Sequence, residues 1–391
     1  MIDTFKIKDG SRFGNRALII GIIGLALSLL GFFIDRNHFF FAYLTAFTFW
    51  LTVALGGLFF VMLHHLVNAT WSIVLRRIAE NIMSMIPFLA IFVIPILFGI
   101  GNLYHWSHAD ILAENPVLRG KAVYLNTPFF IIRTVLYFAV WIFLTRALYK
   151  LSIAQDKEHD ENRTIRLRRI SAPGMVAFAF TFTFASFDWL MSLNAAWYST
   201  AFGVYIYSGS VLSCLAFLTL TVIYLQRRGY LKDIITPEHY HDLGKLLFTF
   251  VVFWAYIAFA QYFLIWYGNI PEETQLYHAR WGGWWNVASL LIVFGHFVFP
   301  FIILITRSAK RSLPMMTFMG FWLLLMHWVD LYWVIRPGHA EHALQSVWID
   351  LATMVGIGGL FLWYFWRRLS SEPLIPVTDP RLKASIGLQS D

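Results

Sequence analysis

Ten long apolar stretches, separated by polar gaps, dominate the hydrophobic pattern of this 391-residue chain. Each stretch is long enough to cross a hydrocarbon core about 30 Å thick as a helix that rises about 1.5 Å per residue. The ten predicted spans are 17–34, 40–63, 82–104, 128–148, 173–197, 200–225, 246–267, 285–306, 314–335 and 347–366. The pattern therefore predicts an all-α integral membrane protein with ten transmembrane helices.

The predicted spans form one membrane domain that covers the whole chain and contains a weak internal repeat. Spans two to five and spans six to nine cross the membrane in the same order of directions. The last span of each set carries a carboxylate beside aromatic residues, Asp188 in one set and Asp330 in the other. This arrangement predicts two consecutive four-helix bundles, 40–197 and 200–335, with 17–34 and 347–366 as flanking helices.

Lysine and arginine are unevenly distributed between the two sides of the predicted membrane. Of the 29 that lie outside the span interiors, 24 fall in the N-terminal tail, the even-numbered gaps and the C-terminal tail. By the positive-inside rule this side is cytoplasmic, which places both termini inside the cell. The formal net charge of +8 suits loops that face anionic lipid and does not indicate nucleic acid.

Composition limits the chemistry that the chain can carry by itself. It is 59% hydrophobic, and its only cysteine, Cys214, lies within a span. A single thiol excludes an intrachain disulfide, a thiolate iron-sulfur cage and a CxxCH haem attachment. The longest polar gap, 149–172, is predicted to be a solvated loop or a short helix, and no gap is large enough for a soluble catalytic domain. Any redox centre of the usual kind must therefore belong to another chain.

Polar side chains inside the spans concentrate in the outer half of the predicted membrane. A charge at the bilayer centre costs roughly 2.5–3.5 kcal/mol, so we expect these groups to face a bundle interior, to pair or to be neutral. The outer set comprises Asn102, His105, His108, Arg133, Asp188, Gln261, His327, Asp330 and Asp350.

Each of these groups has a structural and a functional interpretation. Asp188 and Arg133 lie at similar depth on adjacent spans, where they form either a packing ion pair or part of a proton route. His327 and Asp330 are three residues apart and share a helix face. Asp350 lies near the start of its span, which favours a helix-end cap. The glycines Gly356, Gly358 and Gly359 indicate close helix packing, and Pro87, Pro95 and Pro300 indicate helix kinks.

Three classes of function are compatible with this pattern. A subunit that binds a lipid-soluble quinol needs an aromatic pocket with histidine and carboxylate groups near one face, and the outer set fits this description. A secondary transporter needs discontinuous helices and polar groups at mid-depth, and the proline-bearing third span is compatible with it. A haem b anchor needs two facing histidines, for which His64 or His65 with His296 is the only candidate pairing. No metal site is predicted.

Three sequence motifs carry a resemblance to a known family. They are LYHWSH at 103–108, SFDWLMSL at 186–193 and WYSTAFGVY at 197–205. With the span number and orientation, they resemble the NrfD/PsrC-like membrane subunits of bacterial alternative complex III, a quinol:cytochrome c or quinol:electron-acceptor oxidoreductase. The likeness is nearer to the ActF-type subunit than to the ActC-type one.

This resemblance implies a role in respiratory or photosynthetic electron transport in the bacterial inner membrane. The expected partners are a paralogous ActC-like membrane subunit, an iron-sulfur subunit, haem c subunits and lipids, with no nucleic acid. The iron-sulfur clusters and haem c belong to the partner subunits, and a quinone such as menaquinone is a non-covalent ligand. Quinol is oxidised near the periplasmic face in such complexes, and the membrane subunits are associated with proton translocation.

Carried onto this chain, the resemblance assigns candidate roles without naming a certain catalytic residue. Asp188, His105 and His108 become outer proton-handling groups, and Arg133 sets the charge of Asp188. His327 and Asp330 serve the second bundle, and Gln261 belongs to the outer pocket. An ActF-like subunit is expected to act as a proton route or as a scaffold with a vestigial quinol pocket.

Overall fold

A computed structural model describes residues 5–7, 10–157, 161–337 and 346–388 of the chain. Ten helical segments in these ranges are long and apolar enough to cross a membrane, which confirms the predicted all-α multi-pass membrane fold. Eight of them are continuous helices: α1 (Gly10–Ile34), α2 (Arg36–Leu66), α9 (Thr127–Lys157), α10 (Glu161–Trp189), α11 (Phe202–Arg227), α12 (Pro237–Gly268), α17 (Leu313–Ile335) and α18 (Val347–Leu369).

The third and eighth spans are interrupted helices. The third consists of α3 (Ile73–Met83), α4 (Ile86–Leu89), η2 (Ala90–Val93), α5 (Ile94–Phe98) and α6 (Ile100–Leu103). The eighth consists of α14 (Gly283–Leu291), the π-helical turn η5 (Ile292–Val298) and α15 (Phe299–Leu304). The short connecting helices are η3 (His105–Ser107), α7 (Ala109–Glu114), α8 (Pro116–Lys121), η4 (Met191–Asn194), α13 (Pro271–His278), α16 (Arg307–Arg311) and α19 (Leu382–Ile386).

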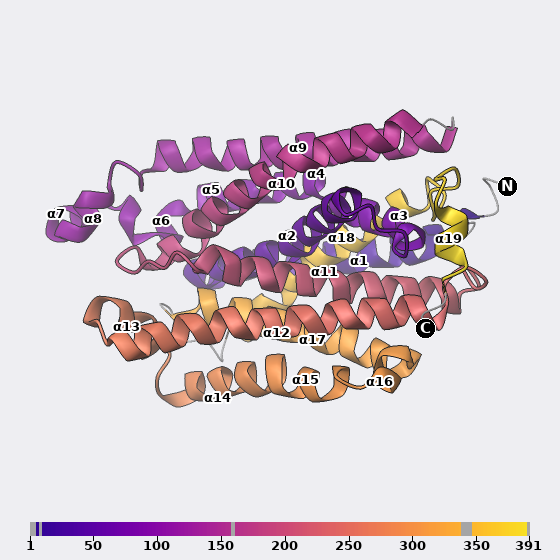
Figure 1. Cartoon of the computed structure of the whole chain (residues 1–391). Helices are drawn as coiled ribbons and strands as arrows, with labels where there is room; N and C mark the ends of the chain where they lie inside the picture. The colour runs from indigo at the N-terminus through magenta and orange to yellow at the C-terminus, as the bar shows by residue number, and fades with distance from the viewer. Residues whose placement is uncertain (1–4, 8–9, 158–160, 338–345, 389–391) are drawn as a thin grey trace.

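The spans lie roughly along one axis, so the molecule has two ends (Figure 1). Both chain termini lie at the end that also holds α16 and α19, which we call the terminal end. Helices α7, α8 and α13 lie at the opposite end, which we call the distal end. An even number of crossings returns the chain to the side on which it began.

Helices α2 and α11 form the centre of the molecule, and most of their residues are buried. They pack against each other, and α2 also contacts α3, α10, α17 and α18. On the other side, α11 contacts α12 and α17, while α9 packs on α10. The two halves of the chain therefore meet around α2 and α11.

Helices α1 and α18 meet along a row of small residues. A Cβ added at Gly359 would lie 2.4 Å from the Cα of Gly21, and one added at Gly24 would lie 2.6 Å from the backbone nitrogen of Gly356. Such stripes let two helix backbones approach closely in a membrane, where dispersion and hydrogen bonds hold helices together. The expected close packing at Gly356 and Gly359 is therefore present, and Gly358 lies against Trp50 instead.

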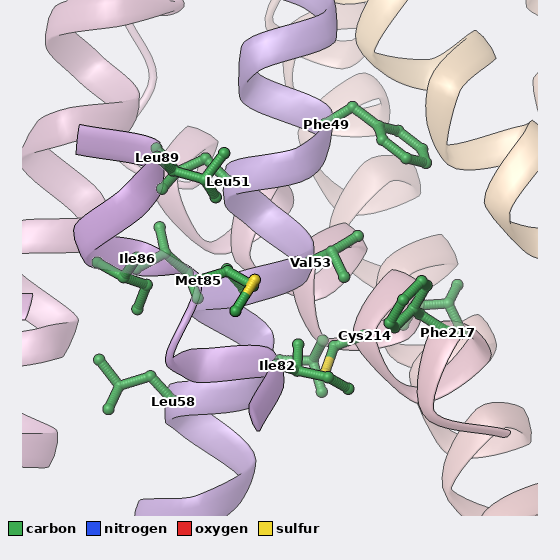
Figure 2. Close-up of a cluster of buried hydrophobic side chains, with 14 of the residues drawn as sticks. Phe49, Leu51, Val53, Leu58, Ile82, Met85, Ile86, Leu89, Cys214 and Phe217 are labelled. Carbon is green, nitrogen blue, oxygen red and sulfur yellow. The ribbon is translucent and has the colours of Figure 1, made fainter. Parts of the chain in front are cut away.

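The third span differs from the continuous 82–104 helix that its hydropathy predicts. The helix begins at Ile73 and breaks after Met83, and 3-10 geometry follows at 90–93. Proline lacks an N–H group, so Pro87 and Pro95 cannot donate to the carbonyls four residues earlier. Apolar side chains surround the break, including those of Met85 and Leu51 (Figure 2).

The 149–172 gap is not a solvated loop. Helix α9 continues to Lys157 and α10 begins at Glu161, so both spans extend beyond the membrane core as long helices. Leu148, Ser152 and Gln155 recur at helical spacing on the buried side of α9. The hydropathy pattern did not reveal this helical periodicity, because the gap also contains many charges of both signs. The fifth span also ends earlier than predicted, at Trp189, and is followed by η4.

The C-terminal segment folds back over the terminal end. The backbone N–H of Leu374 donates to the carbonyl of Phe5 over 3.0 Å, and the hydroxyl of Ser385 donates to the carbonyl of Trp71 over 3.0 Å. Leu374 is fully buried. This segment therefore belongs to the folded protein and covers the ends of α2 and α3.

The charge distribution predicts which end faces the cytoplasm. A cysteine introduced at Lys232, an exposed residue in the segment that joins α11 to α12 at the terminal end, is expected to resist an impermeant thiol reagent in intact cells. A cysteine introduced at Glu272, exposed at the distal end, is expected to react. The native Cys214 is buried and gives a low background. Labelling at Lys232 with protection at Glu272 would reverse the orientation.

Candidate functional site

A cavity of about 390 Å³ lies at the distal end between the two halves of the chain. Its walls come from η4, the start of α11, α12, α13 and the end of α17, together with residues around α6 and α7. Most of the lining is apolar, and its polar side chains include those of His105, Tyr205, Gln261 and Arg280. Such a mixture, apolar walls with a few polar groups, is typical of sites for small organic ligands.

Tyr205 connects this cavity to a buried carboxylate. Its hydroxyl donates a hydrogen bond to Asp330, which is 2% exposed. The indole N–H of Trp254 donates to the other carboxylate oxygen over 3.2 Å. In the described part of the chain no Lys, Arg or His side chain forms an ion pair or hydrogen bond with Asp330, so both of its hydrogen-bond partners are neutral donors. Asp330 can therefore take up a proton without leaving a buried cation unpaired.

His327 lies one helical turn from Asp330 on α17 but has different partners. Its Nε2 atom is 2.9 Å from the hydroxyl of Thr52 on α2, and its Nδ1 atom has no hydrogen-bond partner among the described residues. Gly209 on α11 lies next to both side chains and has no side chain of its own to fill the space beside them. A Cβ there would lie 3.0 Å from His327 Nδ1 and 3.8 Å from Asp330 Oδ2.

The π-helical turn η5 adds a further histidine near this group. The ring of His296 stacks on that of Trp254, with the centroids 4.0 Å apart. Neither ring nitrogen of His296 has a hydrogen-bond partner in the part of the chain that the structure describes. Trp254 therefore lies between a buried histidine and the buried Asp330. Single π-helical turns occur frequently at functional sites.

Asp188 has a different environment from Asp330, although each lies on the last span of a predicted four-span set. Arg133 holds it with two hydrogen bonds, from Nε over 2.7 Å and from Nη2 over 2.9 Å. The hydroxyl of Tyr137 donates to it over 2.6 Å. The guanidinium also lies 3.9 Å from the ring centroid of Tyr124 and 4.3 Å from that of Phe129. The expected Arg133–Asp188 pair is thus present, and this bidentate ion pair compensates the charge of the Asp188 carboxylate.

The two histidines of the LYHWSH motif do not join Asp188. His105 lines the distal cavity, and His108 bonds to the carbonyl of Gly101 over 2.7 Å. Both side chains are exposed, whereas Asp188 is fully buried. Gln261 accepts a hydrogen bond from Ser199 over 3.0 Å and lines the same cavity. The structure therefore groups His105 with Gln261 and places Asp188 in a separate cluster.

Arg280 lines the cavity, although the hydropathy pattern indicates only that it is a cation in a loop between two spans. It donates to the carbonyls of Trp333 and Val334, each over 2.9 Å, and its guanidinium lies 4.4 Å from the ring centroid of Trp333. Burial lowers the pKa of Arg280 to about 10. It therefore remains a cation at neutral pH on the cavity wall, near the ring of Tyr205.

Asp350 does not cap its helix as its position near the start of the span suggested. It pairs with Arg336, and its Oδ2 atom is 3.0 Å from Nε2 of His38. No side chain caps α18, whose N-cap residue is Ser346. His38 and Asp350 are 312 residues apart in the sequence, so no local pattern predicted this buried triad.

A second buried charge cluster lies at the terminal end. Arg76 lies 2.8 Å from Asp379 of the C-terminal segment, and Arg77 lies 2.5 Å from Asp156 on α9. Glu80 accepts from Ser152 over 2.8 Å. Although burial raises it, the pKa of Asp379 is held below its usual range by Arg76 and Arg381. These residues tie α3, α9 and the C-terminal segment together.

Two of the histidines considered for a haem b anchor, His64 and His296, each lie against an aromatic ring. The ring of His64 is tilted against that of Phe60 with the centroids 3.8 Å apart, and its Nδ1 atom is 2.7 Å from the carbonyl of that residue. His296 stacks instead on Trp254 in the second half of the chain. The described residues also contain no group of three or more His, Cys, Asp or Glu side chains arranged to hold a metal ion.

Comparisons with known proteins add no identification. No protein-family model matches the chain, and no curated protein matches its sequence. The function is therefore inferred from the residues of the site.

Proposed function

We propose that this chain is a membrane subunit of a quinol-oxidising electron-transport complex, in which its second half carries protons between the distal cavity and buried groups. Quinol would be the substrate, and an iron-sulfur partner subunit would accept its two electrons. The proposal places the chain in a bacterial inner membrane with its termini in the cytoplasm. The distal cavity would then lie near the periplasmic face.

The observation that carries this proposal is the bridge made by Tyr205. Its ring lines the cavity, and its hydroxyl bonds to Asp330 behind the cavity wall. A hydroxyl can accept a proton on its oxygen while it passes its own proton to the carboxylate. Proton transfer of this kind needs donor and acceptor within hydrogen-bond reach, which this pair satisfies.

The chemistry of the cavity suits a quinol head group. Its volume of about 390 Å³ falls within the range of about 300–1,000 Å³ that small-molecule sites occupy. His105 and Gln261 are hydrogen-bonding groups on its wall, and Arg280 supplies positive charge. The cation would stabilise negative charge that develops on a quinol oxygen as its proton leaves.

Beyond the carboxylate, the relay would continue to His327. Gly209 has no side chain to fill the space near Asp330 and the Nδ1 atom of His327, and this nitrogen has no hydrogen-bond partner among the described residues. A proton would cross this space through side-chain rotation or a bridging water. His327 in turn contacts Thr52 of the first half of the chain.

A secondary transporter is less well supported by the same structure. The third span is discontinuous, as transporters often require, but apolar side chains surround its break, among them Met85, Ile86 and Leu89 (Figure 2). The arginines of α3 before the break are paired with Asp379 and Asp156, and Asp330, which has no cationic partner among the described residues, lies behind the distal cavity.

Asp330→Asn tests the relay. In the assembled complex we expect this change to preserve subunit content and to reduce quinol-driven turnover about 100-fold, because an amide keeps the shape but cannot exchange a proton. Asp110→Asn is the matched control, since it removes an exposed carboxylate at the same end and should leave turnover unchanged. Wild-type turnover and proton release per electron in Asp330→Asn would contradict the proposal.

Gly209→Ala tests the connection between Asp330 and His327 without altering either titratable group. The added methyl would lie about 3.0 Å from His327 Nδ1 and would occupy the space between the two side chains. We expect slower turnover, with a larger solvent isotope effect than in the wild type. Unchanged turnover together with an unchanged isotope effect would show that the proposed relay does not extend from Asp330 to His327.

A further inference from the structure

A lipid-facing groove lies between α9 and α10, outside the site described above. It has a volume of about 500 Å³ and an almost wholly apolar lining. On α9 it is bordered by Ala139, Val140, Phe143 and Leu144, and on α10 by Arg169, Ile170, Pro173, Gly174 and Ala177. Phe143 is 68% exposed, and the neighbouring Val176 and Phe180 are also exposed, so this face lies in the hydrocarbon layer.

Small side chains form the floor of the groove. A Cβ at Gly174 would lie 2.9 Å from a methyl of Leu144 and 3.2 Å from the sulfur of Met62, so α10 approaches its neighbours closely at this point. The groove then runs over Ala139 and Ala177, beside the protruding ring of Phe143. Pro173 cannot donate to the carbonyl of Arg169, which leaves that carbonyl without its helical hydrogen bond.

One cation lines the groove, and helical spacing places three more on the same two helices toward the terminal end. Arg169 belongs to its lining, and Arg166 lies about one turn further toward the terminal end of α10. On the facing helix, Arg146 and Lys150 follow Phe143 at helical spacing. All four side chains are exposed, and within the described residues none forms an ion pair. At about 1.5 Å per residue, Arg146 lies about 10 Å from Ala139 along α9.

We propose that this groove binds a phospholipid with an anionic head group. One acyl chain would occupy the apolar part between Ala139 and Ala177, and the phosphate would lie among Arg146, Lys150, Arg166 and Arg169. Basic pockets beside transmembrane helices select anionic lipids because the cations lie at head-group depth. The groove is apolar at the depth of the acyl chains and cationic at the depth of the lipid phosphates. This change from apolar to cationic matches the two parts of a phospholipid, whereas a partner helix would not require it.

Lipid retention by the full-length chain tests this site. The chain is reconstituted in phosphatidylcholine bilayers that contain some phosphatidylglycerol, extracted in mild detergent and examined by native mass spectrometry. Each cation contributes roughly fivefold to anionic lipid affinity, so the double change Arg166→Gln with Arg169→Gln should weaken phosphatidylglycerol binding by roughly 25-fold. The matched control, Arg228→Gln with Lys232→Gln, removes two exposed charges elsewhere at the terminal end. An equal loss in the control would overturn the site.

A second variant tests the acyl-chain part of the groove. Ala139 is exposed, so Ala139→Trp fills the groove without displacing the protein core and should reduce bound phosphatidylglycerol at least as much as the charge changes do. Val176→Trp, on the same lipid-facing surface but outside the groove, should have no effect. Wild-type lipid retention in Ala139→Trp would overturn the proposal.

The occupant is identified in native membranes with a benzophenone side chain at position 139. Cross-linking to lipid would support the proposal. Cross-linking to a polypeptide would overturn it and assign the groove to a partner helix. This inference stands apart from the proposed quinol chemistry, because its readout is bound lipid and not turnover.

Discussion

Arg133→Ala is expected to destabilise the protein by about 3–5 kcal/mol, because it strands the buried carboxylate of Asp188. Among the described residues, Arg133 supplies two of the three side-chain hydrogen bonds that Asp188 receives, and Asp188 is fully buried. Of these donors, Tyr137 would remain. The apparent free energy of unfolding, measured by titration with a denaturing detergent, provides the comparison with the wild type.

A double-mutant cycle separates the packing role of this pair from a role in proton transfer. Asp188→Asn leaves the Arg133 cation against Tyr124 and Phe129 and is expected to reduce stability as well. Replacing both residues with apolar ones of similar volume should recover most of the loss, because no buried charge remains. Tyr137→Phe, which removes one hydrogen bond, should cost only about 1 kcal/mol. If Asp188→Asn kept wild-type stability but lowered proton-coupled turnover, the packing explanation would fail.

Gly359→Val is expected to separate α1 from α18. A Cβ at this position would lie 2.4 Å from the Cα of Gly21, and backbone atoms cannot move aside without shifting the whole helix. Overpacking typically costs about 1–3 kcal/mol, and a contact with backbone should lie at or above the upper end of this range. The hydroxyls of Ser28 and Thr353, 2.7 Å apart, would lose their hydrogen bond as the helices separate.

Disulfide formation between cysteines at positions 28 and 353 measures this separation. We expect efficient cross-linking in an otherwise wild-type chain and strong loss of cross-linking when Gly359→Val is added. Gly120→Val is the matched control, because no atom lies within 4 Å of a Cβ at Gly120. Undiminished cross-linking in the Gly359→Val chain would show that the α1–α18 interface tolerates side chains at this position.

The candidate site was partly predictable from the sequence. Hydropathy and charge placed Arg133 and Asp188 at the same depth on adjacent spans, and the pair is present. His327 and Asp330 were placed on one helix face, and both face the interior. Their partners were not predictable, because Tyr205 belongs to a different helix and, although it ends the WYSTAFGVY motif, nothing in its local pattern pairs it with Asp330.

Residues far apart in the sequence account for most of what was missed. His38 and Arg336 join Asp350 from the ends of two other helices, and Asp379 reaches Arg76 from the C-terminal segment. Arg280 was counted as an ordinary loop cation, although the fold buries it in the wall of the distal cavity. No local pattern reports on such contacts, since they depend on where distant helix ends meet.

The sequence by itself determined the number of membrane spans and the return of both termini to one end. These properties depend on the length and apolarity of each segment, which are local, and on the requirement that backbone polar groups be satisfied within the bilayer. Only the tertiary structure decided which buried polar groups meet. Helix rotation and translation set those contacts, and they depend on the packing of small residues such as Gly24, Gly209 and Gly359 against distant helices. Asp188 and Asp330 therefore look alike in the sequence, yet an arginine compensates one and two neutral donors hold the other.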